Sequence, residues 1–401
     1  LLVGMSLFHL YAAIEIVPAQ VLRPVHVGWT LLLVFLLFPI AARFRNRLMW
    51  WDVVCAVLGV ATIAYLIAGG DDIWDRNTLP NQADIVFGVA FVLLVLEAVR
   101  RTSGWIMLFV IGLFLAYGFL GPWLPGQWAH RGYDVSRVVG HLFITLEGIF
   151  GVPVDVSSSL IILFTIYGAF LQHSGAGKFY LDWSFAAMGS RHSGAGRTVV
   201  LASFLLGGPS GSGVATTVTI ASVAYPMLKR AGYGAEAAGG LLAAGGLGAI
   251  ISPPVLGAAA FLIAEFLKIS YLDVLLMATV PTLLYYLSLF LMVELDTRKF
   301  GLPDVAIAVE GQLALLTKRY WYHFVSLLAI VAFMVWGFSP MLAVFWASVV
   351  TFAVSFLRRD TAMGWRKVVA ALRDGSGQML NVAATCAAAG IIVGVVAKTG
   401  L

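Results

Sequence analysis

The stretch TVVLASFLLGGPSGSGVATTVTIASVAYPML (Thr198–Leu228) contains no charged residue, and GGPSGSG (Gly207–Gly213) interrupts its apolar run in the middle. A second interruption, GAIISPPV (Gly248–Val255), lies in the next long apolar stretch. An unwound backbone at membrane depth has no water to satisfy its N–H and C=O groups, so such breaks occur where protein buries them or where they line a cavity. Paired interrupted helices indicate the substrate and ion site of a secondary transporter.

The composition around these breaks is that of a polytopic membrane protein. Of the 401 residues, 11% are charged and 61% are hydrophobic, whereas roughly a quarter of the residues in an average soluble domain are charged. The basic residues fall in short clusters between apolar segments, so cytoplasmic loops explain the formal net charge of +5. We therefore expect membrane lipid around the chain and no nucleic-acid partner. The absence of a Walker motif from the sequence argues against nucleotide binding.

The apolar runs predict an all-α fold with about 11 membrane-spanning helices. The short loops at residues 43–47 and 100–101 are basic, and the loop at residues 71–75 is acidic. Because basic loops stay in the cytoplasm, the N-terminal end is predicted to be cytoplasmic. The acidic loop, the loop at residues 121–153 and the end of the last span at residues 379–398 are then predicted on the outside. Since the chain begins without Met and stops directly after this span, we expect it to continue at both ends.

The two interrupted stretches predict different shapes. From Arg197 to Leu206 a helix would be about 15 Å long, half of the roughly 30 Å hydrocarbon core. Both ends of the segment are basic, which favours a re-entrant hairpin with Pro209–Gly213 at its tip. The second stretch predicts a broken membrane helix, because the adjacent prolines at Ser252–Pro254 remove two N–H donors and block the preceding turn.

A weak internal sequence similarity predicts an inverted repeat. Ser157–Gly177 resembles Ser376–Leu401, and the two segments are predicted to cross the membrane in opposite directions. The first repeat would occupy about residues 156–295, and the second would be truncated before its own hairpin. Residues 361–372 predict a separate amphipathic helix along the cytoplasmic interface.

Hydroxyl and backbone groups at the breaks are the candidate ligands. Turned carbonyls and hydroxyls can hold a hard cation such as Na⁺ without a carboxylate. The N–H groups at the start of the half-helix from Val214 can hold an anion. The alternative explanation is that Gly, Ser and Ala merely permit close helix packing. The histidines show no ligand spacing, so we expect neither a catalytic metal nor a cofactor.

Pro209–Val274 resembles the large membrane subunit of the tripartite ATP-independent periplasmic (TRAP) transporters, and it is closest to the TAXI subgroup, in which the small and large membrane subunits are fused. The resemblance implies that residues 1–97 form a small-subunit-like four-helix scaffold and that residues 98–401 form the large-subunit-like transport region. It also implies an elevator-type permease in a bacterial or archaeal cytoplasmic membrane.

The activity implied by the resemblance is symport of organic anions, chiefly carboxylates, driven by a Na⁺ or H⁺ gradient. A periplasmic solute-binding receptor would deliver the substrate, and no ATPase subunit would take part. The oxygens proposed for Na⁺ belong to Ser210, Ser212, Gly248 and Ile251, and the residues proposed to face the substrate are Gly211, Thr216, Thr217, Ser252 and Pro253.

Three alternative functions remain open at this stage. One is a carboxylate symporter that needs no receptor, and another is a purely structural membrane subunit. The third is an integral membrane transferase, for which HSGAG (His192–Gly196) is the nearest candidate motif. This motif has no acidic partner nearby in the sequence, so we do not expect an enzyme.

Overall fold

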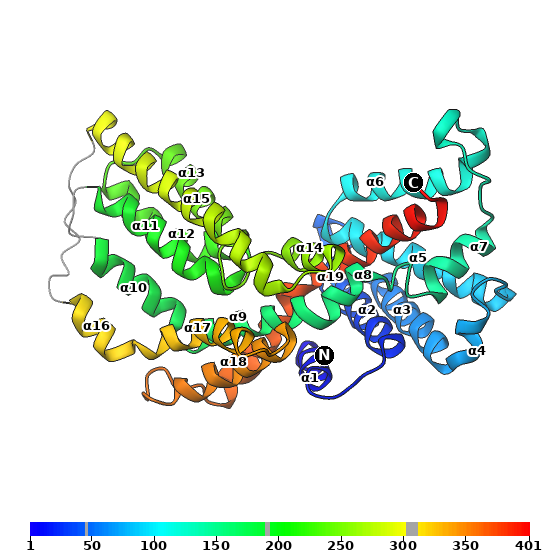
Figure 1. The fold of residues 1–401 in the computed structure, drawn as a ribbon, viewed down its shortest axis with the longest axis horizontal. Coiled ribbons are helices and arrows are strands. Elements are labelled where there is room, and N and C mark those ends of the chain that lie inside the picture. Colours follow the sequence, from blue (N-terminus) through cyan, green and yellow to red (C-terminus); the bar gives the residue numbers. More distant parts are fainter. Residues whose placement is uncertain (45–46, 189–192, 302–311) are drawn as a thin grey trace. The chain divides into compact units, whose positions relative to one another are not determined.

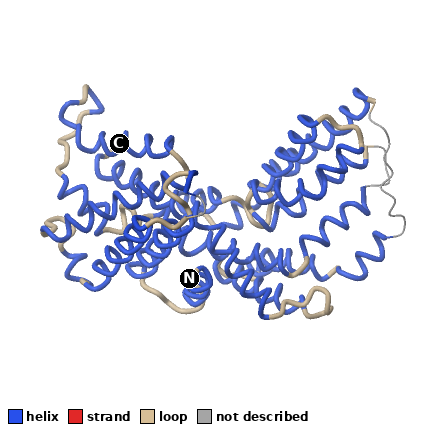
Figure 2. The backbone as a smooth tube through the Cα atoms, turned by 180° about the vertical axis from the view of Figure 1, so that it is seen from behind, coloured by secondary structure: helices blue, strands red, loops and turns tan. Residues whose placement is uncertain are grey.

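The computed structural model describes residues 1–44, 47–188, 193–301 and 312–401. All regular secondary structure in these residues is helical (Figures 1 and 2), which confirms the all-α part of the predicted fold class, while the count of about 11 spans stays a prediction. The chain divides into two compact units, Leu1–Ile162 with Ser376–Leu401 and Leu163–Gly375. The predicted boundary at residue 97 separates a small-subunit-like region from a large-subunit-like region. It does not refer to compact units of the fold, and it stays a prediction.

The first unit contains the N-terminal helices and the end of the last helix. Its core includes the ion pair between Arg101 and Asp52, whose side chains are 1% and 2% exposed. Its helices are α1 (Leu2–Ala12), α2 (Ala19–Leu37), α3 (Trp50–Ala68), α4 (Gly70–Asp75), α5 (Gln82–Thr102), α6 (Trp105–Leu120), α7 (Val135–Val139), the π-helix η4 (Gly140–Ile144), α8 (Val152–Val156) and the π-helix η5 (Ser157–Ile161), with 3₁₀ turns η1 (Ala42–Phe44), η2 (Gly121–Trp123) and η3 (Gly126–Trp128).

The second unit contains both interrupted stretches. Its helices are α9 (Ile162–His173), α10 (Ala176–Met188), α11 (Gly194–Ser210), α12 (Gly213–Arg230), α13 (Ala235–Leu247), the 3₁₀ turn η6 (Gly248–Ile250), α14 (Ala258–Leu267), α15 (Tyr271–Phe300), α16 (Gln312–Tyr320), α17 (Tyr322–Val335) and α18 (Pro340–Ser355). The chain then enters α19 (Trp365–Thr399). Helix α10 is fastened to α16 and α17, because the indole of Trp183 donates to Thr317 and the hydroxyl of Tyr180 donates to the His323 carbonyl.

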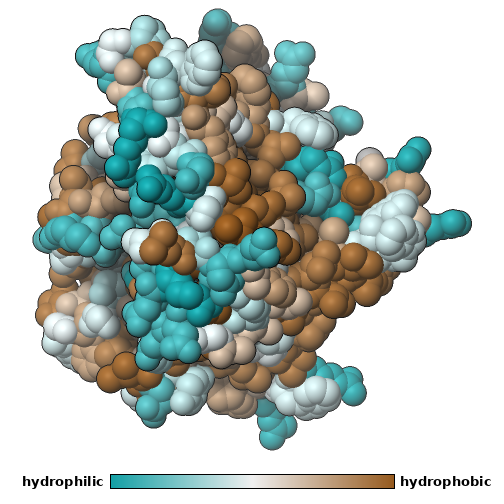
Figure 3. Space-filling view, turned by 90° about the vertical axis from the view of Figure 1, so that its right-hand side faces the viewer, coloured by the Kyte–Doolittle hydropathy of each residue, from teal (hydrophilic) through white to brown (hydrophobic). Residues whose placement is uncertain are grey.

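Seven helices in the described ranges are long and apolar enough to cross a membrane, and further apolar helices of 10–17 residues accompany them. Large apolar side chains remain exposed on these helices, as on α6, where Ile106 is 83% and Phe109 68% exposed. Figure 3 shows one face of the molecule on which hydrophobic residues cover wide areas between hydrophilic groups. An apolar surface of this extent requires lipid or protein around it, which makes this a multi-pass membrane protein.

The end of the chain differs from the prediction. Residues 365–372 of the predicted amphipathic helix and the last span at residues 379–398 belong to one uninterrupted helix, α19, while residues 361–364 precede it. The two segments were predicted separately, but Gly375 between them has a packing role that keeps the helix continuous. A Cβ atom at this position would lie 2.7 Å from the Cα atom of Ile166, so the glycine permits close approach of two helices rather than ending one of them.

Candidate functional site

The first interrupted stretch forms a helical hairpin. Helix α11 continues through Gly207–Pro209 to Ser210, beyond the predicted end at Leu206, and α12 begins at Gly213 and packs against it. The break is therefore shorter than predicted. Gly211 ends α11 with φ +56°, a left-handed conformation that favours glycine. Ser212 then caps α12 by accepting a hydrogen bond from the backbone N–H of Ala215 at 3.3 Å.

The second interrupted stretch breaks its helix between α13 and α14. The turn closes on itself, since the N–H of Gly257 donates to the carbonyl of Ile250 at 2.7 Å. The buried hydroxyl of Ser252 donates to the Gly248 carbonyl at 2.7 Å. Backbone groups freed by the break therefore find partners inside the protein, as a break at membrane depth requires.

The structure brings the two breaks together. The N–H of Val255 donates to the carbonyl of Gly208 at 3.0 Å, so the broken helix is hydrogen-bonded to the hairpin next to its tip. Glycine is needed for this approach, because a Cβ atom on Gly208 would lie 2.6 Å from the Pro253 oxygen. A Cβ atom on Gly213 would likewise lie 3.0 Å from the Gly246 oxygen. Two sequence features about 40 residues apart thus form one backbone-lined joint.

The proposed Na⁺ ligands lie in and beside this joint. The Gly248 carbonyl accepts hydrogen bonds from the Ser252 hydroxyl at 2.7 Å and from the Ile251 N–H at 3.2 Å. The Ile251 carbonyl accepts one from the Thr282 hydroxyl at 2.5 Å. The Ser212 hydroxyl is the α12 cap, and the side chain of Ser210 lies outside the described residues.

The proposed substrate residues divide between two places. Thr216 is buried and lines a cavity on the α9–α10 side of the hairpin. Ser252 is buried on the opposite side, 3.4 Å from the Tyr286 hydroxyl, while Gly211 and Pro253 belong to the joint itself. Thr217 donates back to the Gly213 carbonyl at 2.8 Å. The structure therefore does not gather all five residues around one cavity.

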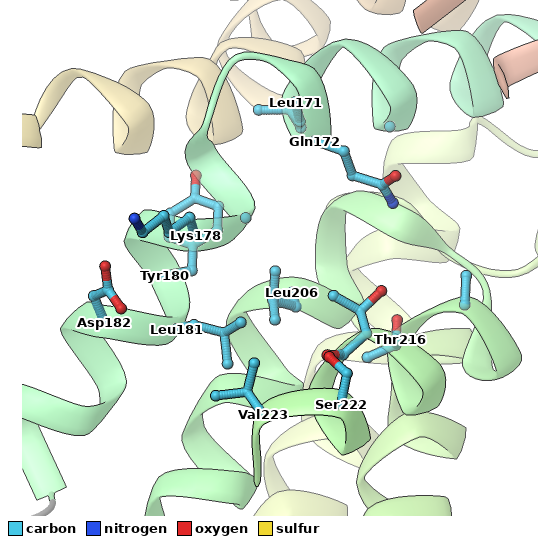
Figure 4. Close-up of a pocket in the computed structure, with 14 residues that line it drawn as sticks. Leu171, Gln172, Lys178, Tyr180, Leu181, Asp182, Leu206, Thr216, Ser222 and Val223 are labelled. Carbon is cyan, nitrogen blue, oxygen red and sulfur yellow. The ribbon is translucent and has the colours of Figure 1, made fainter. Parts of the chain in front are cut away.

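The cavity beside the hairpin has a volume of about 460 Å³, within the range of small-molecule sites. Helices α9 and α10 form one wall, and α11 and α12 form the other (Figure 4). The polar side chains that line the cavity include Gln172, Lys178 and Asp182 from α9 and α10 and Thr216, Thr219 and Ser222 from α12. In Figure 4 Asp182 and the Lys178 ammonium lie on the side of the cavity away from Thr216 and Ser222, and both residues also line a neighbouring cavity against α16. Gln172, Lys178 and Asp182 were not predicted as site residues. In the sequence they only follow a predicted span, and their place in the cavity depends on how α10 packs against the hairpin.

The base of the hairpin is held by a carboxylate. Glu294 on α15 forms ion pairs with Arg197 on α11 and with Arg298, and it accepts a hydrogen bond from the Ser193 hydroxyl at 2.9 Å. The Arg197 guanidinium also lies 5.1 Å from the ring centre of Phe290. The hairpin is therefore attached to its neighbours at both ends, at the tip through Val255 and at the base through Glu294. His192, in the motif considered for a transferase, lies outside the described residues.

Asp182 makes the charge of the cavity dependent on pH. Helix α10 is not one of the apolar helices, and burial raises the pKa of the Asp182 carboxyl above its ordinary value, while the nearby Lys178 charge partly opposes this. As the pH falls towards this raised pKa, the wall loses a negative charge and attracts an anion more strongly.

For any anion that binds in this cavity, we expect Asp182→Asn to lower the Kd about three- to tenfold at neutral pH, since a unit charge at ~4 Å in water is worth about 1 kcal/mol. The variant should also show a weaker fall of Kd on acidification than the unmodified protein. Anion binding measured across a pH series tests this. Glu236→Gln, on the exposed first turn of α13, is the matched control and should leave the Kd unchanged. A Kd for Asp182→Asn equal to that of the control would show that Asp182 does not act on an anion in this cavity.

The comparison with protein families shows that these features belong to a component of a transporter. Residues 90–401 match the family described as "Tripartite ATP-independent periplasmic transporter, DctM component". The match covers both interrupted stretches, the cavity and all of the second compact unit. No curated protein matches the chain.

Proposed function

Because the chain belongs to the DctM family of TRAP transporter components, we propose that it performs secondary active uptake of organic anions, chiefly carboxylates, coupled to a Na⁺ or H⁺ gradient. A periplasmic solute-binding protein delivers the substrate, and transport follows an elevator-type alternating access. The family is one of transporter components rather than enzymes. The proposed location is the cytoplasmic membrane, with the N-terminal end inside.

The contact between the hairpin and the broken helix supports the proposal independently of the family match. The hairpin and the broken helix, which lie far apart in the sequence, meet through the hydrogen bond from Val255 to Gly208, and a cavity of about 460 Å³ lies against the same hairpin. Interrupted helices placed in this way are how secondary transporters build a substrate and ion site. A purely structural subunit would gain nothing from two breaks at membrane depth.

The chemistry of the cavity fits an anion. The ammonium of Lys178 supplies a positive charge on one wall. The first turn of α12, which includes Ala215 and Thr216, supplies the positive end of a helix dipole on the other. The Gln172 amide adds a neutral hydrogen-bond donor. We assign these groups to the substrate carboxylate, with Thr216 as the buried contact and Lys178 as the exposed one.

The joint suits a cation, in keeping with the oxygens proposed from the sequence. A carbonyl oxygen has two lone pairs, and the Ile251 carbonyl accepts one hydrogen bond from Thr282. The Gly248 carbonyl carries two donors, so it becomes a ligand when the Ser252 hydroxyl turns towards Tyr286, which is 3.4 Å away. Residues Ser210 and Ser212 complete the proposed set. This arrangement supports Na⁺ over H⁺, because it offers neutral oxygens rather than a titratable group.

The N-terminal region supports the proposal of fused components. The family match begins at residue 90, so α1, α2, α3 and α4 precede it, whereas α5 runs across its start. We assign residues 1–97 to the small component of a TAXI-type transporter.

Uptake by proteoliposomes containing the complete gene product tests the function directly. A mixture of carboxylates is offered with and without the solute receptor encoded beside the gene, under a Na⁺ gradient, a H⁺ gradient or no gradient. We expect uptake that requires both the receptor and the Na⁺ gradient. Gradient-driven uptake without the receptor would show an ordinary symporter, and the absence of uptake with every gradient would overturn the transport proposal.

The ion ligands are tested by removing hydroxyls at the hairpin tip. We expect Ser210→Ala combined with Ser212→Ala to raise the Na⁺ concentration needed for half-maximal uptake by about tenfold or more, since each lost hydroxyl ligand costs roughly 1 kcal/mol. Ser288→Ala removes an exposed hydroxyl from α15, where it donates to the Tyr285 carbonyl and lies outside the cavity, and serves as the control. Unchanged Na⁺ dependence in the double variant would exclude these two serines as ligands.

A further inference from the structure

Three segments predicted on the outside meet at one end of the first compact unit. The hydroxyl of Tyr133 donates to the Lys398 carbonyl at 2.6 Å, and the His141 ring is 3.0 Å from the Gly394 carbonyl, so the loop after η3 and the helix η4 both contact the end of α19. Residue Asn77, just after α4, packs so closely on Gly140 that a Cβ atom there would collide with the Asn77 carbonyl. This interlocking makes the outer end of the unit a defined surface.

A cavity of about 450 Å³ lies between these segments. Its volume is within the range of small-molecule sites, and it is separate from the cavity beside the hairpin. The side chains that line it are mainly polar: Trp74, Asn77, His141, Thr145, Glu147 and Lys398.

Two side chains of opposite charge, Glu147 and Lys398, line this cavity. Neither Glu147 nor Lys398 forms an ion pair within the described ranges of the chain. The Lys398 ammonium instead lies 5.9 Å from the centre of the Tyr133 ring. Nε2 of His141 must donate to the Gly394 carbonyl, because a carbonyl only accepts. In a neutral ring this leaves Nδ1 as an acceptor.

We propose that this cavity binds a small zwitterion, with its ammonium group at Glu147 and His141 and its carboxylate or phosphate at Lys398. A simple anion would meet the Glu147 carboxylate, and a simple cation would meet the Lys398 ammonium. Only a ligand that carries both charges satisfies both side chains at once. The site is distinct from the proposed transport path, and the inference does not depend on the proposed function.

Two sources supply this chemistry. One is a free α-amino acid outside the membrane, and the other is the phosphoethanolamine headgroup of a lipid. To distinguish these two ligands, the complete protein is titrated with L-alanine, propionate and ethylamine. The protein is held in nanodiscs of phosphatidylglycerol, with or without phosphatidylethanolamine, and binding is followed by calorimetry.

We expect L-alanine to bind at least about tenfold more tightly than propionate or ethylamine, because each analogue lacks one of the two charges. A weaker apparent affinity for alanine when phosphatidylethanolamine is present would identify the headgroup as a second occupant of the same site. The same affinity in both membranes would identify the free amino acid as the ligand. Either result supports a zwitterion site.

Charge variants link the binding to the two side chains. We expect Glu147→Gln and Lys398→Gln each to weaken alanine binding about tenfold or more, and the exchange Glu147→Lys with Lys398→Glu to restore part of it. Asp71→Asn, on exposed α4, is the matched control. Equal binding of all three probes, no binding of alanine in either membrane, or unchanged affinity in both Gln variants would overturn the proposal. The uptake assay reads the transport function separately, so the two can fail independently.

Discussion

Replacing Gly208 by valine is expected to abolish uptake while leaving the protein folded in the membrane. A Cβ atom at this position would lie 2.6 Å from the Pro253 oxygen and 3.3 Å from Cδ of Pro254. These are backbone and ring atoms that cannot turn aside as a flexible side chain would. The hairpin must therefore move away from the broken helix, and the hydrogen bond from Val255 to Gly208 is lost. Overpacking of this kind costs about 1–3 kcal/mol locally, which distorts a site more readily than it unfolds a protein.

The measurement is initial uptake by proteoliposomes, with the thermal unfolding of the purified variant as the check on folding. Gly240→Val is the matched control. It introduces the same side chain into α13, where a Cβ atom would have no heavy atom within 4 Å. We expect the control to keep most of the uptake. Normal uptake by Gly208→Val would show that the contact between the two breaks is dispensable.

Reversing the charge of Lys178 is expected to produce the second large effect, a rise in KM for an anionic substrate of about 30-fold. Lys178→Glu changes the charge at the cavity wall by two units. At roughly 1 kcal/mol for each unit charge near water, this amounts to about 2 kcal/mol. We expect Lys178→Gln to have about half of this effect in free energy and Lys178→Arg to stay close to the unmodified protein.

Substrate concentration series measured at high and low salt separate this effect from a change in folding. The KM difference should shrink at high salt, because Lys178 is exposed and salt screens exposed charges. Lys299→Glu, at the exposed end of α15 in the same compact unit, is the control for a general change in surface charge. If it raises KM as much as Lys178→Glu does, the local role of Lys178 is wrong.

The hairpin and the broken helix were predictable because their causes are local. The four glycines of Gly207–Gly213, and the adjacent prolines Pro253 and Pro254, disfavour a long continuous helix whatever the tertiary arrangement. The exact end of α11 could not be predicted, because a helix can accommodate Gly207 and Gly208 in its last turns when they pack on another backbone. The continuity of α19 through Gly375 has the same origin, because the contact with Ile166 is visible only in the fold.

The cavity could be predicted only in part. Thr216 was selected because it follows the break, and it does line the cavity. Lys178 and Asp182 carry no local signal, as an exposed lysine and aspartate four residues apart are typical of any solvated helix. Their role depends on α10 lying opposite the hairpin. Ser252 was grouped with Thr216 by the similarity of the two breaks, but the turn directs its hydroxyl to the Gly248 carbonyl instead.

The attachment of the hairpin at both of its ends restricts how the cavity beside it can open. The tip is bound to the broken helix through Val255, and the base is bound to α15 through Glu294. Swinging the hairpin about its base would break the hydrogen bond at the tip, and displacing α10 would break its hydrogen bonds to α16 and α17. Opening from either wall therefore has to break at least one polar contact, and a cross-link between Leu181 and Val223, which line the two walls, is expected to slow entry of a ligand.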